Sequence, residues 1–181
     1  IDSGIDYEYP DLWYLVDLSR SVSFVPSDDA LVDTYFAGRH YVTDLNFHGT
    51  HVAATVASNA LICAGVTSQT ALMGVKVCDY SGSCATSAVI QGILYAVDNG
   101  ADVASMSFSA SITSDPATDA ALQYAFNGGV TLLAATSNSN ESVVRYPANT
   151  SWVIAVGAAS PCGERKRSSS SQLELNPGVQ A

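Results

Sequence analysis

The chain has 181 residues, enough for one α/β domain with a hydrophobic core. Hydrophobic residues make up 48% and charged residues 13%, which excludes a disordered chain, and the net charge of −10 argues against a nucleic-acid-binding protein, because such proteins usually present a basic face. The chain contains no run of 18 apolar residues, so no membrane span is predicted. The opening IDSG lacks the charged and apolar regions of a signal peptide.

The first regular element is expected in the stretch FHGTHVAATVA, where His48 opens a helix of small residues, and apolar runs alternate with helical periods after it. Residues 13–43 carry no clear pattern, so we predict irregular structure there. Residues 71–77 form a short apolar run, which predicts a buried strand. Residues 86–99 carry apolar residues at helical spacing between a Thr or Ser cap and Gly100, which predicts a helix.

The second half of the chain continues this alternation. A strand is predicted at 101–108 and a helix at 115–129, with Asp115 as its cap and Pro116 in its first turn. Further strands are predicted at 130–135 and 152–158. Alternating strands and helices favour a mostly parallel sheet with helices on both faces, so the fold class is α/β with a three-layer α/β/α arrangement. We find neither a repeat nor a linker and treat 1–181 as part of a single domain.

The cysteines indicate whether the protein resides in an oxidising or a reducing compartment. Cys78 and Cys84 bracket a short loop, which either closes as a local disulfide or holds two unpaired small hydrophobic residues. A disulfide would favour an oxidising compartment. Asn140 and Asn149 open glycosylation sequons, which are weak support for secretion. Cys63 is interpreted as a buried thiol, and Cys162 as a partner for a cysteine outside this chain.

Three polar residues are candidates for chemistry because they lie at predicted strand ends or helix starts, where open α/β sheets collect catalytic groups. These are Asp2, His48 and Asn138. Asp, His and an amide donor are three parts of an acyl-transfer site. Taken singly they read as a turn, a helix start and a loop residue. A zinc site at His48 and His51 is disfavoured because the His-Glu-x-x-His arrangement is absent.

Taken together, consecutive blocks of the chain resemble the subtilisin-like serine proteases (subtilases). The blocks that carry the resemblance are IDSGIDYEYPDL, DLNFHGTHVAATVA, LMGVKVCDYSGSCATSAVIQGI, NGADVASMSF and GVTLLAATSNS. Their order and spacing agree with that family, and they cover nearly the whole chain. The resemblance implies a secreted endopeptidase that hydrolyses peptide bonds through an Asp–His–Ser triad.

The resemblance also implies residue roles. Asp2 matches the catalytic Asp, His48 the catalytic His and Asn138 the oxyanion-hole Asn, roles for which this family is itself a standard example. His51 matches a structural His, and Gly49 is expected to leave space around the imidazole.

Substrate would pair as an extended peptide with two segments of the chain. These segments correspond to Gly82, Ser83 and Cys84, and to Ser107, Phe108 and Ser109.

Several positions depart from the family pattern, which usually has glycine there. They are Phe47, Ala54, Ser109, Ala110 and Ser137. Side chains at Ser109 and Ser137 should narrow the main side-chain pocket, so we expect a preference for small or medium residues before the scissile bond.

The family's nucleophile motif Gly-Thr-Ser-x-Ala does not occur in the chain, and Ser168–Ser171 do not resemble it. We therefore expect the chain alone to be an inactive, N-terminal part of a peptidase domain, with a propeptide or the C-terminal remainder as its partner. The alternative is a non-catalytic subtilase-like domain that binds peptides or proteins.

Many family members bind Ca²⁺, and Asp11 matches a common ligand position. The loop that follows the catalytic helix is shorter than usual, so Asp11 is either a calcium ligand or an ordinary turn residue. No organic cofactor, nucleic-acid partner or membrane partner is expected. Polypeptides are the expected substrates, and the expected location is extracellular.

Overall fold

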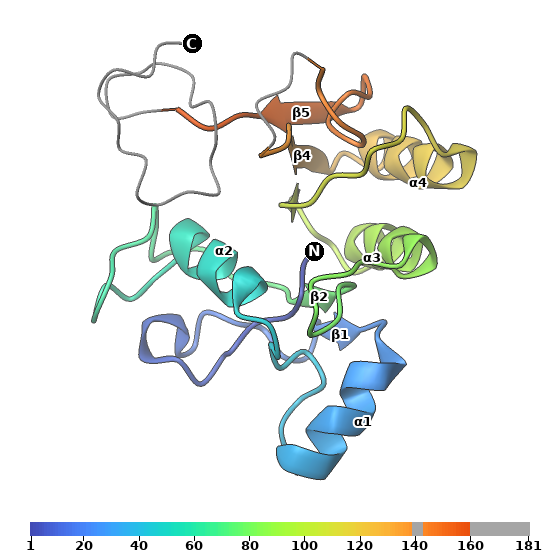
Figure 1. Ribbon diagram of the computed structural model, residues 1–181. Coiled ribbons are helices and arrows are strands. Elements are labelled where there is room, and N and C mark those ends of the chain that lie inside the picture. Colours follow the sequence, from blue (N-terminus) through green and yellow to red (C-terminus); the bar gives the residue numbers. More distant parts are fainter. Residues whose placement is uncertain (139–142, 160–181) are drawn as a thin grey trace. The chain divides into compact units, whose positions relative to one another are not determined.

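The computed structural model describes residues 1–138 and 143–159. Asn140, Cys162 and Ser168–Ser171 lie outside the described residues, so the predictions made for them stay predictions. The fold divides into two compact units, Ile1–Ala104 and Ser105–Ala181, and each is described by itself (Figure 1).

Parallel pairing around β2 (Val75–Lys76) organises the first unit. On one side β1 (Val22–Ser23) pairs with β2 in parallel, with Val22 opposite Val75. On the other side Asp2 forms a parallel bridge with Lys76: the Asp2 N–H donates to the Val75 carbonyl at 3.0 Å, and the Val77 N–H donates to the Asp2 carbonyl at 2.8 Å. The strand predicted at 71–77 is therefore present but shorter.

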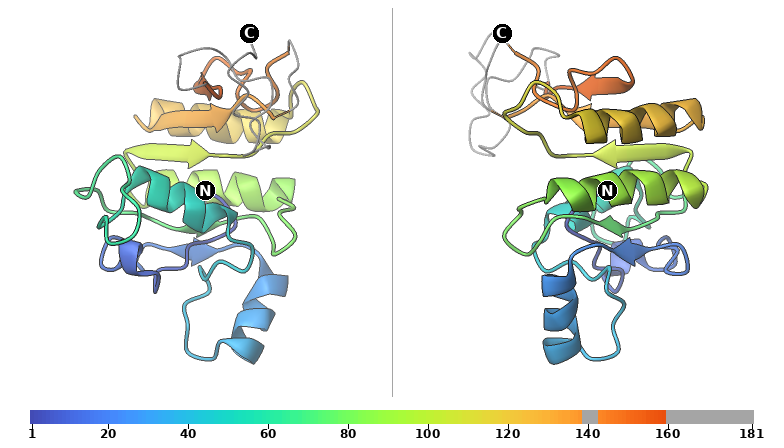
Figure 2. Two further views of the ribbon diagram at one scale, coloured as in Figure 1. Left: turned by 60° about the vertical axis from the view of Figure 1, so that its left-hand side comes forward. Right: turned by 90° about the vertical axis from the view of Figure 1, so that its right-hand side faces the viewer.

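Helix α3 (Thr86–Asp98) packs on β2 (Figure 2). Its buried face consists of Ala88, Val89, Gly92, Ile93 and Ala96. The spacing of these small and branched residues buries one stripe of the helix against the strand. The predicted helix is confirmed, but the predicted Thr or Ser cap is wrong: Ala85 is the N-cap, and Thr86 already lies in the first turn.

The expectation of irregular structure over 13–43 is wrong. This stretch holds β1 and helix α1 (Pro26–Tyr35). The helix buries only Asp28 and Val32, so it offers little apolar periodicity to recognise in the sequence. Asp28 Oδ2 pairs instead with Lys76 Nζ at 2.8 Å, and both side chains are fully buried. A buried ion pair thus attaches α1 to β2.

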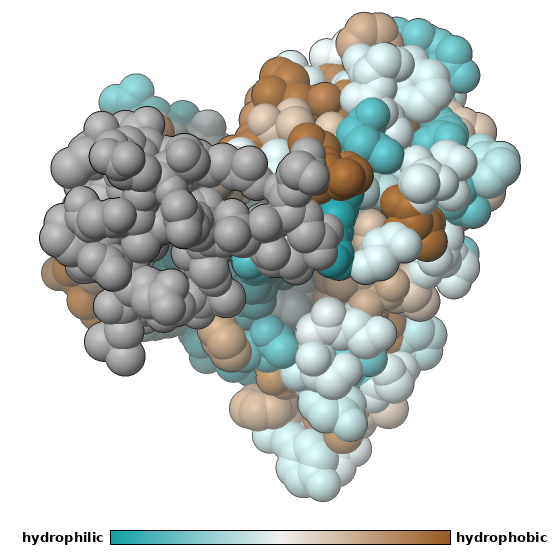
Figure 3. Space-filling model, turned by 45° about the horizontal axis from the view of Figure 1, so that its top comes forward, coloured by the Kyte–Doolittle hydropathy of each residue, from teal (hydrophilic) through white to brown (hydrophobic). Residues whose placement is uncertain are grey.

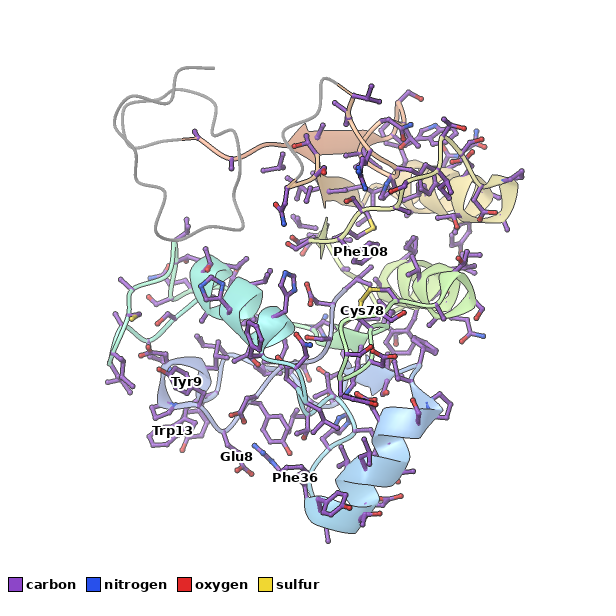
Figure 4. The ribbon with its side chains drawn as sticks, viewed as in Figure 1. Glu8, Tyr9, Trp13, Phe36, Cys78 and Phe108 are labelled. Carbon is purple, nitrogen blue, oxygen red and sulfur yellow. A yellow bond between two sulfur atoms is a disulfide. The ribbon has the colours of Figure 1, made fainter. Side chains whose placement is uncertain are left out.

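Helix α2 (His48–Val56) packs against the short helix η1 (Pro10–Leu12). Ile5, Leu12 and Ala53 form the buried cluster between them, with partly buried hydrophobic neighbours that include Tyr9. Figure 4 labels Tyr9 next to η1. This packing places the start of α2 beside the N-terminal segment of the chain.

The second unit is built on a three-stranded sheet in the order β3–β4–β5. Strand β3 (Val103–Met106) crosses the boundary between the units. Strands β4 (Thr131–Ala135) and β5 (Val153–Val156) pair in parallel, with Leu132 opposite Val153. The predicted strands at 101–108, 130–135 and 152–158 are confirmed, each with fewer residues.

Helix α4 (Pro116–Asn127) packs on β4. Asp115 is its N-cap, and the Asp115 carboxylate accepts a hydrogen bond from the Thr118 N–H at 2.9 Å. Pro116 occupies the first helical position, where no N–H partner is needed. Both details of the predicted helix start are confirmed.

The predicted α/β class with parallel strand pairing is confirmed. In the part of the chain that the structure describes, no helix is both long and apolar enough to cross a membrane. Figure 3 shows hydrophobic and hydrophilic residues interspersed on the face in view.

Candidate active site

Asp2 and His48 meet in the first unit. Asp2 Oδ1 lies 2.7 Å from His48 Nδ1, and the same oxygen accepts the Ser3 N–H at 2.7 Å. The Asp2 side chain is 11% exposed, whereas the His48 side chain is 48% exposed. Asp2 Oδ2 is buried without a hydrogen-bond partner among the described residues. A largely buried carboxylate therefore holds one ring nitrogen of an imidazole that solvent can reach.

Two glycines bring these side chains together. A Cβ on Gly49 would collide with the Gly4 carbonyl oxygen and lie 3.2 Å from Asp2 Cβ, so the second residue of α2 lies directly against the Asp2 segment. Gly4 has φ of +121°, and a Cβ there would meet the Val42 carbonyl oxygen at 2.5 Å. Gly49 is thus required for close approach of two backbones, which differs from the expected role of leaving space around the imidazole.

Asp44, which the sequence analysis did not single out, organises the start of α2. Its Oδ2 accepts hydrogen bonds from the Thr50 N–H at 2.9 Å and from the Thr50 hydroxyl at 2.6 Å. Burial favours the neutral acid, but hydrogen bonds from Thr50, Asn46 and Phe47 outweigh burial and lower the pKa of Asp44. One signal in the sequence was available: an Asp shortly before a helix start is a common cap.

Phe47 is the N-cap residue of α2, and it has φ of +101°. Residues other than glycine adopt such a backbone at a cost, and the Phe47 side chain is 75% exposed. No side-chain hydrogen bond of its own caps the helix. Other side chains therefore accept the first N–H groups of α2: Asn46 Oδ1 accepts that of His48, the Ser3 hydroxyl that of Gly49, and Asp44 Oδ2 that of Thr50.

The segment Gly82–Cys84 lies next to this helix start. Asn46 Nδ2 donates to the Tyr80 carbonyl at 2.9 Å, and a Cβ on Gly82 would lie 3.7 Å from the same Asn46 nitrogen. Cys78 and Cys84 form a disulfide, so that prediction is confirmed (Figure 4). Gly82 and Ser83 are exposed and Cys84 is half-buried.

Comparison with known proteins bears on this arrangement. The model of the subtilase family matches residues 1–179 of the chain.

The chain belongs to the subtilase family.

Several curated proteases are similar to this subtilase chain. Subtilisin of Bacillus pumilus is 37% identical over a region that covers 99% of this chain and 63% of the relative. Subtilisin E of Bacillus subtilis (strain 168) is 37% identical, with 99% of this chain and 45% of the relative covered. The thermophilic serine proteinase of Bacillus sp. (strain AK1) is 35% identical, with 87% and 37% covered. The chain thus spans 45% to 63% of the length of the two subtilisins.

The remaining predicted site residues of this subtilase belong to the second unit. Asn138 and Ser109 are exposed, whereas Ser107, Phe108 and Ser137 are half-buried. Figure 4 labels Phe108. The structure brings Asp2, His48 and the segment Gly82–Cys84 together within the first unit. The roles assigned to the site residues of both units stay predictions.

Ser137 shares one property with Phe47. Its φ is +129°, in the region that favours glycine. Both positions were noted above as sites where the family pattern has glycine. The backbone of this chain keeps the conformation that glycine adopts easily, although the side chain has changed.

The Asp11 carboxylate binds the backbone of a loop and is not an open position for a metal ion. Its Oδ1 accepts the N–H groups of Leu61 and Ile62 at 2.6 and 2.9 Å, and its Oδ2 accepts the N–H of Cys63 at 2.8 Å. Burial raises the pKa of Asp11, but these three amides outweigh burial and the pKa is lowered. Three N–H dipoles aimed at one carboxylate are the surroundings of an anion, not of a cation.

This donor set does not fit a calcium site at Asp11. Among residues 1–138 and 143–159 no group of three or more His, Cys, Asp or Glu side chains is placed to hold a metal ion. Calcium binding therefore stays a prediction from the family resemblance. Cys63 is exposed, so the expectation of a buried thiol is wrong.

Proposed function

We propose that the protein to which this chain belongs is a serine endopeptidase and that Asp2 and His48 are two members of its catalytic triad. The observation that carries the proposal is the 2.7 Å contact between Asp2 Oδ1 and His48 Nδ1, in which the carboxylate is largely buried and the imidazole is half exposed. Membership of the subtilase family supports it.

The geometry supports one assignment of catalytic roles to Asp2 and His48. In this assignment Asp2 Oδ1 accepts a hydrogen bond from the Nδ1–H of His48, which leaves Nε2 as the nitrogen that takes a proton from a serine hydroxyl. As the serine attacks the peptide carbonyl, Asp2 stabilises the imidazolium that forms, and His48 then protonates the departing amine. Asn138 is proposed to donate its amide N–H to the developing oxyanion. The nucleophile is proposed to come from outside residues 1–181, because no Gly-Thr-Ser-x-Ala motif occurs in them.

The substrate is proposed to be an extended polypeptide. It would pair with the segments Gly82–Cys84 and Ser107–Ser109 by main-chain hydrogen bonds, which accept many sequences. Side chains at Ser109 and Ser137 would narrow the pocket for the residue before the scissile bond. The corresponding specificity is for small or medium residues, and a peptide library cleaved best after Phe or Tyr would contradict it.

The compartment proposed for the enzyme is extracellular. The Cys78–Cys84 disulfide supports an oxidising environment. A propeptide or the C-terminal remainder of the protease is the proposed protein partner. No reaction step is assigned to calcium.

Fluorophosphonate labelling of the native protein tests the function. We expect a label on a serine outside residues 1–181, identified by peptide mass spectrometry, because only a nucleophile activated by His48 reacts readily. The variant His48→Ala should abolish labelling, and the matched control His51→Ala, which changes an exposed histidine one turn further along α2, should retain it.

The opposite result favours the second candidate. Folded native protein that takes up no label, in a sample where a known serine protease is labelled, would refute catalysis by this site. A peptide-binding subtilase-like domain would then be the better account of the retained fold.

A further inference from the structure

Asp44 accepts five hydrogen bonds at the start of α2. Oδ1 accepts the Ser3 hydroxyl at 3.0 Å, the Asn46 N–H at 2.9 Å and the Phe47 N–H at 3.1 Å. Oδ2 accepts the N–H and the hydroxyl of Thr50 at 2.9 and 2.6 Å. Two carboxylate oxygens offer about four acceptor positions, so this carboxylate is fully used.

These donors flank both members of the proposed Asp–His pair. Ser3 follows Asp2, and its N–H donates to Asp2 Oδ1 at 2.7 Å. The Ser3 hydroxyl also accepts the N–H of Gly49, the residue after His48, at 2.9 Å. Phe47 precedes His48. Asp44 therefore binds the backbone on one side of His48 directly and the backbone on the other side through Ser3.

Asp44 binds a strained turn of the backbone just before His48. Phe47 has φ of +101°, which is unfavourable for a side chain other than glycine, and this residue sets the direction in which α2 begins. The Phe47 N–H donates to Asp44 Oδ1, so the carboxylate holds the strained turn. Without that hold, the turn would relax, and the imidazole at the first position of the helix would move with it.

We propose that Asp44 is a positioning residue that fixes His48 Nδ1 against Asp2 Oδ1, acting through Ser3, Phe47 and Thr50. The proposal rests on the proposed function. It goes further because it assigns the geometry of the pair to a carboxylate whose own hydrogen bonds go to residues around the imidazole and not to the imidazole itself.

The same type of contact elsewhere in the chain supplies a control. Asp115 accepts the N–H and the hydroxyl of Thr118 at 2.9 and 2.6 Å, the distances that Asp44 shows to Thr50. Asp115 caps α4, and the hydrogen bonds of its carboxylate go to Thr118 in the first turn of that helix. Substituting Asp115 therefore removes a helix cap of equal kind without touching the Asp2–His48 pair.

The test compares Asp44→Asn with Asp115→Asn in the native protein. Asparagine keeps the size of the side chain but turns one acceptor into a donor that faces N–H and O–H groups. We expect Asp44→Asn to lower kcat by about 10- to 100-fold with KM within about twofold, because a small misplacement of a catalytic group acts on the chemical step. The NMR resonance of the proton on His48 Nδ1 should shift or broaden. Asp115→Asn should change neither.

One result would overturn the proposal: Asp44→Asn with an unchanged Nδ1 resonance and unchanged kcat, and with a fall in Tm equal to that of Asp115→Asn. Asp44 would then be a helix cap and nothing more. If Asp44→Asn does not fold, Ser3→Ala takes its place, since it removes the link from Asp44 to Gly49. An altered Nδ1 resonance in Ser3→Ala supports the proposal, and an unchanged one refutes it.

The two proposals fail in different ways. A wild-type protein that neither cleaves peptides nor takes up fluorophosphonate refutes the proposed function. The Nδ1 resonance is read without substrate or nucleophile, so it still decides whether Asp44 positions His48.

Discussion

The first turns of helices α2 and α4 share one kind of Asp–Thr contact, but their N-cap residues differ. In each, an aspartate accepts a threonine N–H at 2.9 Å and the hydroxyl of the same threonine at 2.6 Å. In α4 the aspartate is the N-cap itself, with an extended backbone at φ −141° and proline next in the chain. In α2 the aspartate lies four residues before the helix, and the N-cap is Phe47 at φ +101°.

The two helix starts differ in whether their contacts are local or long-range in sequence. The cap of α4 is made by neighbours in sequence, so α4 can form its first turn from local contacts. The start of α2 also uses Ser3 and Gly4, more than 40 residues away, which form part of the segment that carries Asp2. A helix start built in this way is harder to form but couples His48 to Asp2. Four changes should break or sharpen this contrast.

The largest effect is expected at the second helical position. Gly49→Ala would push a methyl group into the Gly4 carbonyl and towards Asp2 Cβ, so we expect a loss of about 3 kcal/mol in the free energy of unfolding. The matching position of α4 is Ala117, which is exposed, and Ala117→Gly should cost about 1 kcal/mol or less. Denaturant unfolding of the two variants measures the difference. Equal losses would show that α2 does not depend on this close approach.

The next effect comes from removing each carboxylate. Asp44→Ala leaves the N–H groups of Asn46, Phe47 and Thr50 without their acceptor in a partly buried place, and we expect a loss of about 2 to 3 kcal/mol. Asp115→Ala removes an ordinary cap and should cost about 1 kcal/mol. Thermal unfolding of both variants should therefore rank Asp44→Ala as the less stable. The reverse ranking would contradict the contrast.

A smaller effect of opposite sign is expected at the two N-cap residues. Phe47→Gly relieves the positive φ and loses little packing, because the side chain is 75% exposed, so we expect a gain of about 1 kcal/mol. Asp115→Gly should lose a few tenths of a kcal/mol, roughly the difference between these caps. Melting temperatures that move in the same direction for both variants would argue against strain at Phe47.

The smallest effect is the dependence on pH. The folded-state pKa values of Asp44 and Asp115 lie below the ordinary value of 3.8. For Asp44 hydrogen bonds outweigh burial, and for Asp115 the hydrogen bonds from Thr118 act directly. A lowered folded-state pKa stabilises the protein above pH 3.8, and this contribution is lost as the pH falls below 3.8 through the folded value. The loss of Tm between pH 6 and pH 3, measured by calorimetry, should be reduced in both Asp→Asn variants, and an unchanged loss would contradict the assignment.

These two helix starts also show what could be predicted from the sequence. Asp115 and Pro116 are recognisable because their signals act within one turn. Strands β2 to β5 follow from apolar runs, and α3 follows from helical spacing, whereas β1 was not predicted. Asp44 was missed because four residues separate it from the helix and its partner Ser3 lies 41 residues away. Helix α1 was missed because a buried ion pair, not an apolar stripe, attaches it to β2.

For the site, the resemblance of motifs identified Asp2 and His48, and the structure places them in contact. The reason for Gly49 was beyond the sequence, since only the fold reveals that Gly4 lies against it. The two positive φ values, at Phe47 and Ser137, were also hidden, although the family pattern of glycine at both positions pointed to them.

The Lys76–Asp28 pair has a consequence for the chemistry of the protein surface. The sequence contains two lysines, and Lys76 is the only one among residues 1–138 and 143–159, where its side chain is fully buried. Amine-reactive labels, cross-linkers and solid supports therefore find no lysine on the described surface of the folded protein. Acylation of Lys76 requires unfolding around β2. The rate of acylation at this residue therefore reports how often the first unit opens.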